Sequence, residues 1–172
     1  MKNVLIVVDM QNDFIDMALG TAEALKTVDP VVSLIKDETY DTVIATMDTH
    51  GEDYMDTYEG KHLPVIHCVK GTKGWQINEK VKAALEERNA LVIEKPTFGS
   101  EKLIELLKEE KPESLTFCGL CTDICVISNA LMARAALNGT PMCVYRNACA
   151  GVTPAKHEAA LEVMASCQIE IR

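Results

Sequence analysis

The sequence predicts an α/β fold in which a sheet of parallel strands lies between two layers of helices, a three-layer α/β/α sandwich. Short apolar runs alternate with longer amphipathic stretches, which is typical of parallel strands joined by right-handed helical crossovers. The runs are apolar on both faces and often β-branched, as expected of strands covered on both sides. Because no repeat or Pro/Gly/Ser-rich linker divides the 172 residues, we expect one domain over residues 1–172.

The apolar runs define the expected strands. We expect an edge strand at Ile169–Ile171 and a short extra strand at Val65–Cys68. The expected buried strands are Val4–Val8, Val43–Thr46, Leu91–Ile93, Leu115–Cys118 and Met142–Tyr145.

The stretches between these runs have helical periodicity. Pro30 interrupts the pattern over Glu23–Lys36, so the true helix start should lie near it. Ile124–Leu137 is apolar almost all round and should form a central packed helix. Thr153 and Pro154 fit the N-cap and first position of the last helix. The other expected helices are Asn78–Glu87, Glu101–Glu110 and Lys156–Ala165.

Composition limits the classes of function. With 26 acidic and 17 basic residues the formal net charge is −9, which argues against nucleic-acid binding. The first apolar run, Val4–Val8, is too short to span a bilayer and no cleavage site follows it, so we expect a cytoplasmic protein without a membrane partner. The chain has seven cysteines, an odd number, and without an export signal we expect free thiols rather than disulfides.

Polar side chains follow four of the expected strands. Asp9 follows the first, Asp48 and His50 the second, Lys95 the third, and Cys125 comes just beyond the fourth. Because ligands bind outside the carboxyl ends of parallel strands, these groups should meet at one edge of the sheet. A convergent carboxylate, ammonium and thiol predict a hydrolytic site.

The spacing gives each of these groups a chemical role. Cys125 should lie in the first turn of a helix capped by Thr122 or Asp123, where the positive end of the helix dipole favours a thiolate at neutral pH. Burial should raise the pKa of Asp9 and fit it for proton transfer, and Lys95 should keep both groups charged. Spacing alone also allows a core thiol, a turn aspartate and a solvated lysine at these positions.

A metal site is expected beside them. Asp48 and His50 have the Asp-x-His spacing of oxygen and nitrogen ligands, with His67 as a third ligand and Glu59 as a fourth, directly or through water. This donor set suits Zn²⁺, Mn²⁺ or Fe²⁺, of which we predict zinc. A structural His–Asp hydrogen bond is the alternative. A thiolate cluster is disfavoured because one of its three cysteines ends an apolar strand; the three are Cys118, Cys121 and Cys125.

The acidic loop Thr49–Lys61 holds Tyr54 and Tyr58 and is expected to form a mobile rim or lid. Trp75 is expected to anchor the neighbouring loop.

Two sequence blocks together with Lys95 resemble the isochorismatase-like cysteine hydrolase superfamily. They are Val8–Phe14 (VDMQNDF) and Gly119–Val126 (GLCTDICV), and the resemblance covers essentially the whole chain. It implies a Rossmann-like fold with a mostly parallel six-stranded sheet. It also implies a catalytic triad of Asp9, Lys95 and Cys125, with a non-proline cis peptide before Cys121.

The resemblance further implies a mechanism. Cys125 would attack an amide carbonyl and form a thioester after loss of ammonia, while the N–H groups of Cys121 and Cys125 form the oxyanion hole. Phe14 and Leu120 would contact the substrate.

The metal ligands match one branch of this superfamily. Asp48–His50 and His67–Thr72 resemble the nicotinamidase metal signature, which implies that the metal binds the pyridine nitrogen of nicotinamide. The segment Leu63–His67 departs from the usual Trp-Pro-x-His by an extra residue and the missing Trp. The motifs therefore imply the class of hydrolase, while the substrate stays open. We therefore expect hydrolysis of a small amide, with nicotinamide first.

Two other functions stay open, a hydrolase of the same superfamily acting on a carbamoyl or ureido compound and a non-enzymatic binding member. Cys125 argues against the vinyl-ether-cleaving branch. The resemblance also implies a homodimer or homotetramer.

Overall fold

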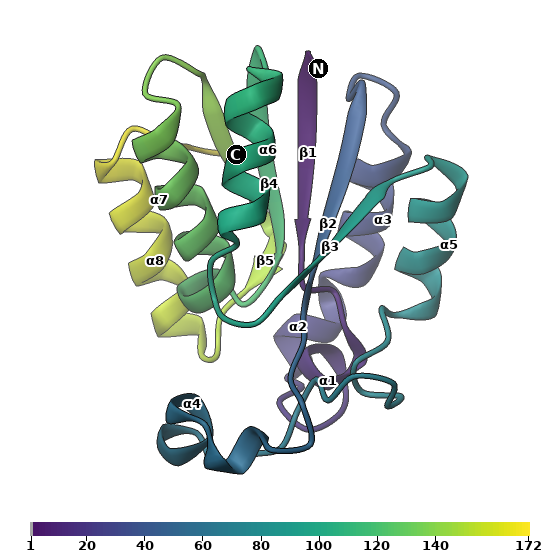
Figure 1. The fold of residues 1–172 in the computed structure, drawn as a ribbon. Coiled ribbons are helices and arrows are strands. Elements are labelled where there is room, and N and C mark those ends of the chain that lie inside the picture. Colours follow the sequence, from purple (N-terminus) through teal and green to yellow (C-terminus); the bar gives the residue numbers. More distant parts are fainter. Residues whose placement is uncertain (1) are drawn as a thin grey trace.

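The computed structural model describes residues 2–172 and has a parallel sheet between two helical layers (Figure 1). Within these residues the sheet has six strands in the order β3-β2-β1-β4-β5-β6, and every neighbouring pair is parallel. The strands are β1 (Asn3–Val8), β2 (Thr42–Asp48), β3 (Leu91–Lys95), β4 (Ser114–Leu120), β5 (Met142–Ala150) and β6 (Glu170–Ile171). The expected α/β sandwich is confirmed, and the sheet is wholly parallel.

Helices cover both faces of the sheet. α3 and α5 pack together on one face, and α6, α7 and α8 form the layer on the other. The α-helices are α1 (Asn12–Ile15), α2 (Ala22–Lys26), α3 (Val28–Lys36), α4 (Tyr58–His62), α5 (Glu79–Glu87), α6 (Glu101–Glu110), α7 (Ile127–Ala136) and α8 (Pro154–Ser166). A 3₁₀ turn, η1 (Tyr54–Asp56), precedes α4, and a π-helical turn, η2 (Thr122–Val126), precedes α7.

The central strands are buried from solvent on both faces, as their composition predicts. Val4–Val8 is completely buried, since β1 pairs with β2 on one side and β4 on the other. Burial of this many branched side chains is the main source of stability in such a sheet.

Local signals place most helix ends correctly. The side chain of Thr153 accepts a hydrogen bond from the Lys156 N–H, and Pro154 opens α8. Pro30 lies in the first turn of α3, where its missing N–H is not needed. The predicted single helix over Glu23–Lys36 is therefore two helices, α2 and α3.

Two strand predictions are wrong. Val65–Cys68 is irregular, and only the next residue, Val69, forms an isolated bridge, with His50. β3 is an edge strand whose Leu91 and Val92 are exposed, although the run was predicted to be buried. A short apolar run does not distinguish an edge strand from a central one, because only the strand order decides this.

No helix in residues 2–172 is both long and apolar enough to cross a bilayer. All seven cysteines are free, which confirms the expectation of free thiols rather than disulfides.

Candidate active site

The carboxyl ends of the strands carry the candidate site. The order of strands changes direction between β1 and β4, and in parallel α/β sheets such a switch point opens a crevice for ligands. Asp9 follows β1 directly, Lys95 is the last residue of β3, and Cys125 lies in η2 just after β4. The strands point toward the end of the molecule where α1, α2 and α4 lie (Figure 1).

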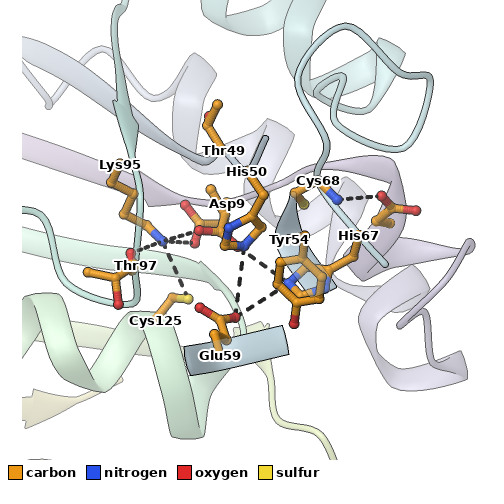
Figure 2. Close-up of polar contacts among 12 residues, drawn as sticks. Asp9, Thr49, His50, Tyr54, Glu59, His67, Cys68, Lys95, Thr97 and Cys125 are labelled. Atoms are coloured by element: carbon orange, nitrogen blue, oxygen red, sulfur yellow. Dashed lines mark hydrogen bonds and ion pairs between the residues drawn. The ribbon is translucent and has the colours of Figure 1, made fainter. Parts of the chain in front are cut away.

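Lys95 connects the three predicted catalytic side chains. Its Nζ lies 2.6 Å from Oδ2 of Asp9 and 3.5 Å from Sγ of Cys125 (Figure 2). It also donates to the carbonyl of Thr97 at 2.9 Å. Burial works to lower the pKa of Lys95, but the charges of Asp9 and Asp48 and the hydrogen bond to Asp9 raise it, so the ammonium stays charged. The solvated alternative for this lysine is wrong, since its side chain is 1% exposed.

Asp9 is held from two sides. The Thr46 hydroxyl donates to its Oδ1 at 2.6 Å, while Lys95 faces its Oδ2. Burial raises the pKa of Asp9, and Asp48 adds to this rise, although Lys95 works against it. The predicted upward shift is confirmed, and its direction suits the carboxylate to proton transfer. Sequence analysis missed Thr46, which reads as an ordinary strand residue.

The protonation state of Cys125 differs from the prediction. The residue lies in the first turn of the η2–α7 helix, as expected, but η2 is π-helical and Cys125 is buried. Burial raises the pKa of its thiol well above the ordinary value, the charge of Asp9 adds to the rise, and Lys95 only partly offsets it. Burial therefore disfavours the expected thiolate in the folded protein. Lys95 contacts both the Asp9 carboxylate and the Cys125 sulfur, and Asp9 is the acidic side chain placed to take the thiol proton.

The backbone before Cys125 has the predicted cis peptide, between Leu120 and Cys121. Cys121 stands at the N-cap position of η2 and lines the cavity described below. Leu120 is completely buried in β4 and does not line that cavity. The predicted contact of Leu120 with substrate stays a prediction, and Ile124 is the nearby residue that lines the cavity.

Four predicted metal ligands lie together beside the lysine. One ligand atom from each of Asp48, His50, Glu59 and His67 lies within 4.8 Å of the other three. Nε2 of His50 is 3.0 Å from Oδ2 of Asp48, and Nε2 of His67 is 3.6 Å from the same oxygen. Oε1 of Glu59 is 3.8 Å from His50 and 3.7 Å from His67 (Figure 2).

The chemistry of this cluster fits a divalent cation. Oδ1 of Asp48 is buried without a hydrogen-bond partner and lies 3.6 Å from the Lys95 ammonium, while its Oδ2 faces both imidazoles as a metal ligand would. Burial works to raise the pKa of Asp48, but hydrogen bonds to His50 and His67 lower it well below the ordinary value, so it is ionised. Nδ1 of His67 lies 2.8 Å from the Val65 carbonyl; because a carbonyl can only accept, Nδ1 carries the proton and Nε2 is free to bind metal. The His50–Asp48 hydrogen bond of the structural alternative is present as well.

The rim loop is fixed at its base. Tyr54 is completely buried and its ring packs against the imidazoles of His50 and His67 in tilted and edge-on geometry. The ring centroids are 4.7 and 4.9 Å away. Its hydroxyl donates to the carbonyl of Leu63 at 2.8 Å. Tyr58, by contrast, is 81% exposed. The two tyrosines that the sequence grouped together thus have different roles.

Trp75 anchors the neighbouring loop, as predicted. Its indole N–H donates to the hydroxyl of Thr49 at 2.9 Å, and its carbonyl accepts from the Gln11 amide at 2.8 Å.

Gln11 and Asp13, both in the block Val8–Phe14, form hydrogen bonds to the segments that carry the metal ligands. The Gln11 side chain accepts from the Asp48 N–H and donates to the Asp48 carbonyl, both at 2.8 Å. Oδ2 of Asp13 accepts the N–H of Cys68, next to His67, at 2.8 Å. The sequence marked Gln11 and Asp13 only as polar residues after a strand, because their partners are far away along the chain.

A cavity of about 230 Å³ joins the two clusters. Its wall is mainly apolar and includes Phe14. A larger hollow of about 630 Å³ adjoins this cavity and is lined in part by His50 and Glu59. Another, of about 620 Å³ between β3 and α5, contains none of the clustered groups. The lining residues are Phe14, Leu19, Asp48, Glu59, Leu63, His67, Phe98, Cys121, Ile124, Cys125, Val152 and Lys156.

A doubly wound sheet with a buried Asp–Lys–Cys cluster at its switch point, next to a metal-ligand cluster, is typical of a cysteine hydrolase built on a parallel α/β sheet. The chain belongs to the isochorismatase domain family, whose family model matches residues 3–172.

Characterised relatives agree with this assignment. The chain is 26% identical to a nicotinamidase of Schizosaccharomyces pombe over 97% of this chain and 91% of that protein. The crystal structure of nicotinamidase/pyrazinamidase PncA from Bacillus subtilis is similar, with 29% identity, a TM-score of 0.86 and 99% of both chains covered. A pyrazinamidase of Pyrococcus horikoshii in complex with zinc matches at 29% identity and a TM-score of 0.81, covering 100% of this chain and 99% of that one.

Proposed function

We propose that this protein hydrolyses nicotinamide to nicotinate and ammonia, with Cys125 as nucleophile and Asp9 and Lys95 as its catalytic partners. The observation that carries the proposal is the position of Lys95, whose Nζ contacts both Asp9 and Cys125 at the wall of one small cavity. The relatives named nicotinamidase by sequence and by structure support the choice of substrate.

The cavity suits a small aromatic amide. Its volume of about 230 Å³ is below the roughly 300–1,000 Å³ of sites for drug-sized ligands. Phe14 and Phe98 supply apolar walls for a ring, and Cys125 lines the same cavity. A substrate ring between these walls would present its carboxamide to the sulfur.

In the first half-reaction Asp9 takes the proton of the Cys125 thiol. The sulfur attacks the amide carbonyl, and the N–H groups of Cys121 and Cys125 receive the negative oxygen. Asp9 then returns the proton to the amide nitrogen, the C–N bond breaks, and ammonia leaves a thioester on Cys125. Lys95 stays protonated throughout and stabilises the negative charge that passes between the carboxylate and the sulfur.

In the second half-reaction water attacks the thioester. Asp9 removes one proton from this water as it adds to the carbonyl carbon. The tetrahedral species collapses, the C–S bond breaks, and the proton passes from Asp9 back to the sulfur. The net reaction is amide plus water to carboxylate plus ammonium.

We propose that Asp48, His50 and His67, with Glu59 as a further ligand, hold a zinc ion. When bound, the ion would act as a Lewis acid toward a ring nitrogen of the substrate. The protein's own contribution is orientation, since Tyr54 and Phe14 pack against the ligating imidazoles. The zinc complex of the related pyrazinamidase supports this choice of metal.

We also propose that residues 1–172 act as one domain, in the cytoplasm, and assemble as a homodimer or homotetramer. The seven free thiols support a reducing compartment. Exposed Leu91 and Val92 on the edge strand β3 support self-association. Light scattering of the purified protein tests the assembly.

A panel of amides tests the proposed reaction. Ammonia release is measured with nicotinamide, carbamoyl and ureido compounds, using the wild-type protein and Cys125→Ala. We expect release from nicotinamide by wild type and none by the variant. Release only from a carbamoyl or ureido compound would replace the substrate assignment, and no release from any amide would leave a binding protein.

A further inference from the structure

Asn129 is a buried polar residue that the reaction described above does not use. It is completely buried on α7, one helical turn after Cys125. Its Nδ2 donates to the carbonyl of Cys125 at 2.8 Å and to the carbonyl of Phe98 at 3.1 Å. Its Oδ1 accepts the N–H of Ser100 at 2.9 Å. A buried amide with three partners is fixed in one orientation, because any rotation leaves polar groups unpaired.

The three bonds join two parts of the active site that are distant in the chain. One is the helical turn that carries Cys125. The other is the segment 96–100, which follows Lys95 directly and enters α6, whose N-cap is Ser100. Within this segment the carbonyl of Thr97 accepts the Lys95 ammonium, and Phe98 forms part of the cavity wall.

Apart from the Lys95–Thr97 hydrogen bond and the N-cap of Ser100, few contacts hold this segment in place. Pro96, Thr97 and Phe98 are exposed, so the hydrophobic effect gives the segment few buried contacts. Gly99 passes so close to α7 that an added Cβ would lie 2.3 Å from Sδ of Met132. The segment therefore lies directly against α7, and Asn129 is the side chain that bonds it there.

We propose that Asn129 is a positioning residue, which sets the separation between Cys125 and the segment that carries the partner carbonyl of Lys95 and the Phe98 wall. It touches no reacting atom. The proposal rests on the proposed function for its consequence in catalysis, but the tether itself is a property of the fold. Misplacement of catalytic groups by about 1 Å can lower rates by about a hundredfold.

One substitution separates the two kinds of bond. A threonine on a helix can donate its hydroxyl to the carbonyl four residues earlier. Asn129→Thr therefore keeps a donor for the Cys125 carbonyl, yet its short side chain cannot also reach the Phe98 carbonyl and the Ser100 N–H. Ser128→Ala is the matched control, because it removes a hydrogen bond within the helix, from Ser128 to the carbonyl of Ile124 at 2.6 Å, and leaves the tether intact.

Two measurements are made on the full-length protein at a temperature where each variant is folded by circular dichroism. Hydrogen–deuterium exchange over 96–100 should become at least about tenfold faster in Asn129→Thr and stay unchanged in Ser128→Ala. With nicotinamide, kcat should fall about tenfold to a hundredfold in Asn129→Thr, while Cys125 still reacts stoichiometrically with a thiol reagent.

The outcomes are distinguishable. Unchanged exchange over 96–100 in Asn129→Thr would overturn the tether, whatever the substrate is. Faster exchange with wild-type kcat and KM would reduce Asn129 to a purely structural residue and overturn its positioning role. If wild type releases no ammonia from any amide, the proposed function fails, while the exchange measurement still decides on the tether.

Discussion

The Nζ atom of Lys95 lies 2.6 Å from Oδ2 of Asp9, and neither side chain is more than 1% exposed. Removing one charge of such a buried pair leaves the other uncompensated, which typically costs about 3–5 kcal/mol. We expect Lys95→Met to lower the free energy of unfolding by that order, measured by urea denaturation, and to abolish ammonia release.

The double variant tests the physical reason. Asp9→Asn combined with Lys95→Met removes both charges, so stability should recover in part while activity stays absent. A double variant that is as unstable as the sum of the two single variants would show that the two residues do not interact as a pair.

Cys125 should be essential for turnover and dispensable for folding. Because its side chain is small and lies at a cavity wall, Cys125→Ala should keep the wild-type fold by circular dichroism. Its rate of ammonia release should fall by at least about a thousandfold, since the residual rate would depend on binding and the oxyanion hole alone. The exposed Cys167 offers the control, and Cys167→Ser should retain full activity. An active Cys125→Ala would remove the covalent mechanism.

The metal-ligand cluster predicts a stoichiometric ion. Protein purified without chelator should contain about one zinc per chain by elemental analysis, and His67→Ala should lose most of it because an imidazole ligand is gone. His62→Ala is the control, since His62 lies on the same segment but contacts the carbonyl of Tyr58 rather than the cluster. Chelation should raise KM for nicotinamide if the ion holds the substrate ring, and equal metal content in both variants would refute the assignment of His67.

The sequence predicted the layers and the chemical groups well because both depend on local signals. Apolar runs, a threonine cap and a proline at a helix start act within a few residues, and α6 was predicted with the same ends as observed. Asp9, Lys95 and Cys125 could be placed together because parallel strands deliver their following residues to one edge.

What the sequence missed depends on distant packing. Thr46 bonds to Asp9 across 37 residues, and the partners of Asn129 in segment 96–100 lie about 30 residues away, so no local pattern marks either. The exposure of β3 follows from strand order, and the raised pKa of the Cys125 thiol follows from its burial, which no local pattern marks. In each case the partner, exposure or pKa depends on residues that are distant in the sequence and close only in the fold.

The buried thiols predict a loss of stability at alkaline pH. Burial raises the thiol pKa of six cysteines in the folded protein, while in the unfolded chain the pKa of a thiol is about 8.5. Below that pH the thiols are neutral in both states and the stability is complete; above it the unfolded chain loses protons that the folded protein keeps, so the free energy of unfolding falls as pH rises. The six are Cys68, Cys118, Cys121, Cys125, Cys143 and Cys149.

Urea denaturation between pH 7 and pH 10 measures this loss. Each thiol that is ionised only in the unfolded chain should contribute about 1.4 kcal/mol per pH unit above its unfolded pKa. Cys118→Ala should reduce the slope by about one thiol's share, because Cys118 is completely buried in β4 and far from substrate. Cys167→Ser, at an exposed position, is the matched comparison. A slope that Cys118→Ala leaves unchanged would mean that this thiol does not stay protonated in the folded state, and that its burial does not oppose ionisation.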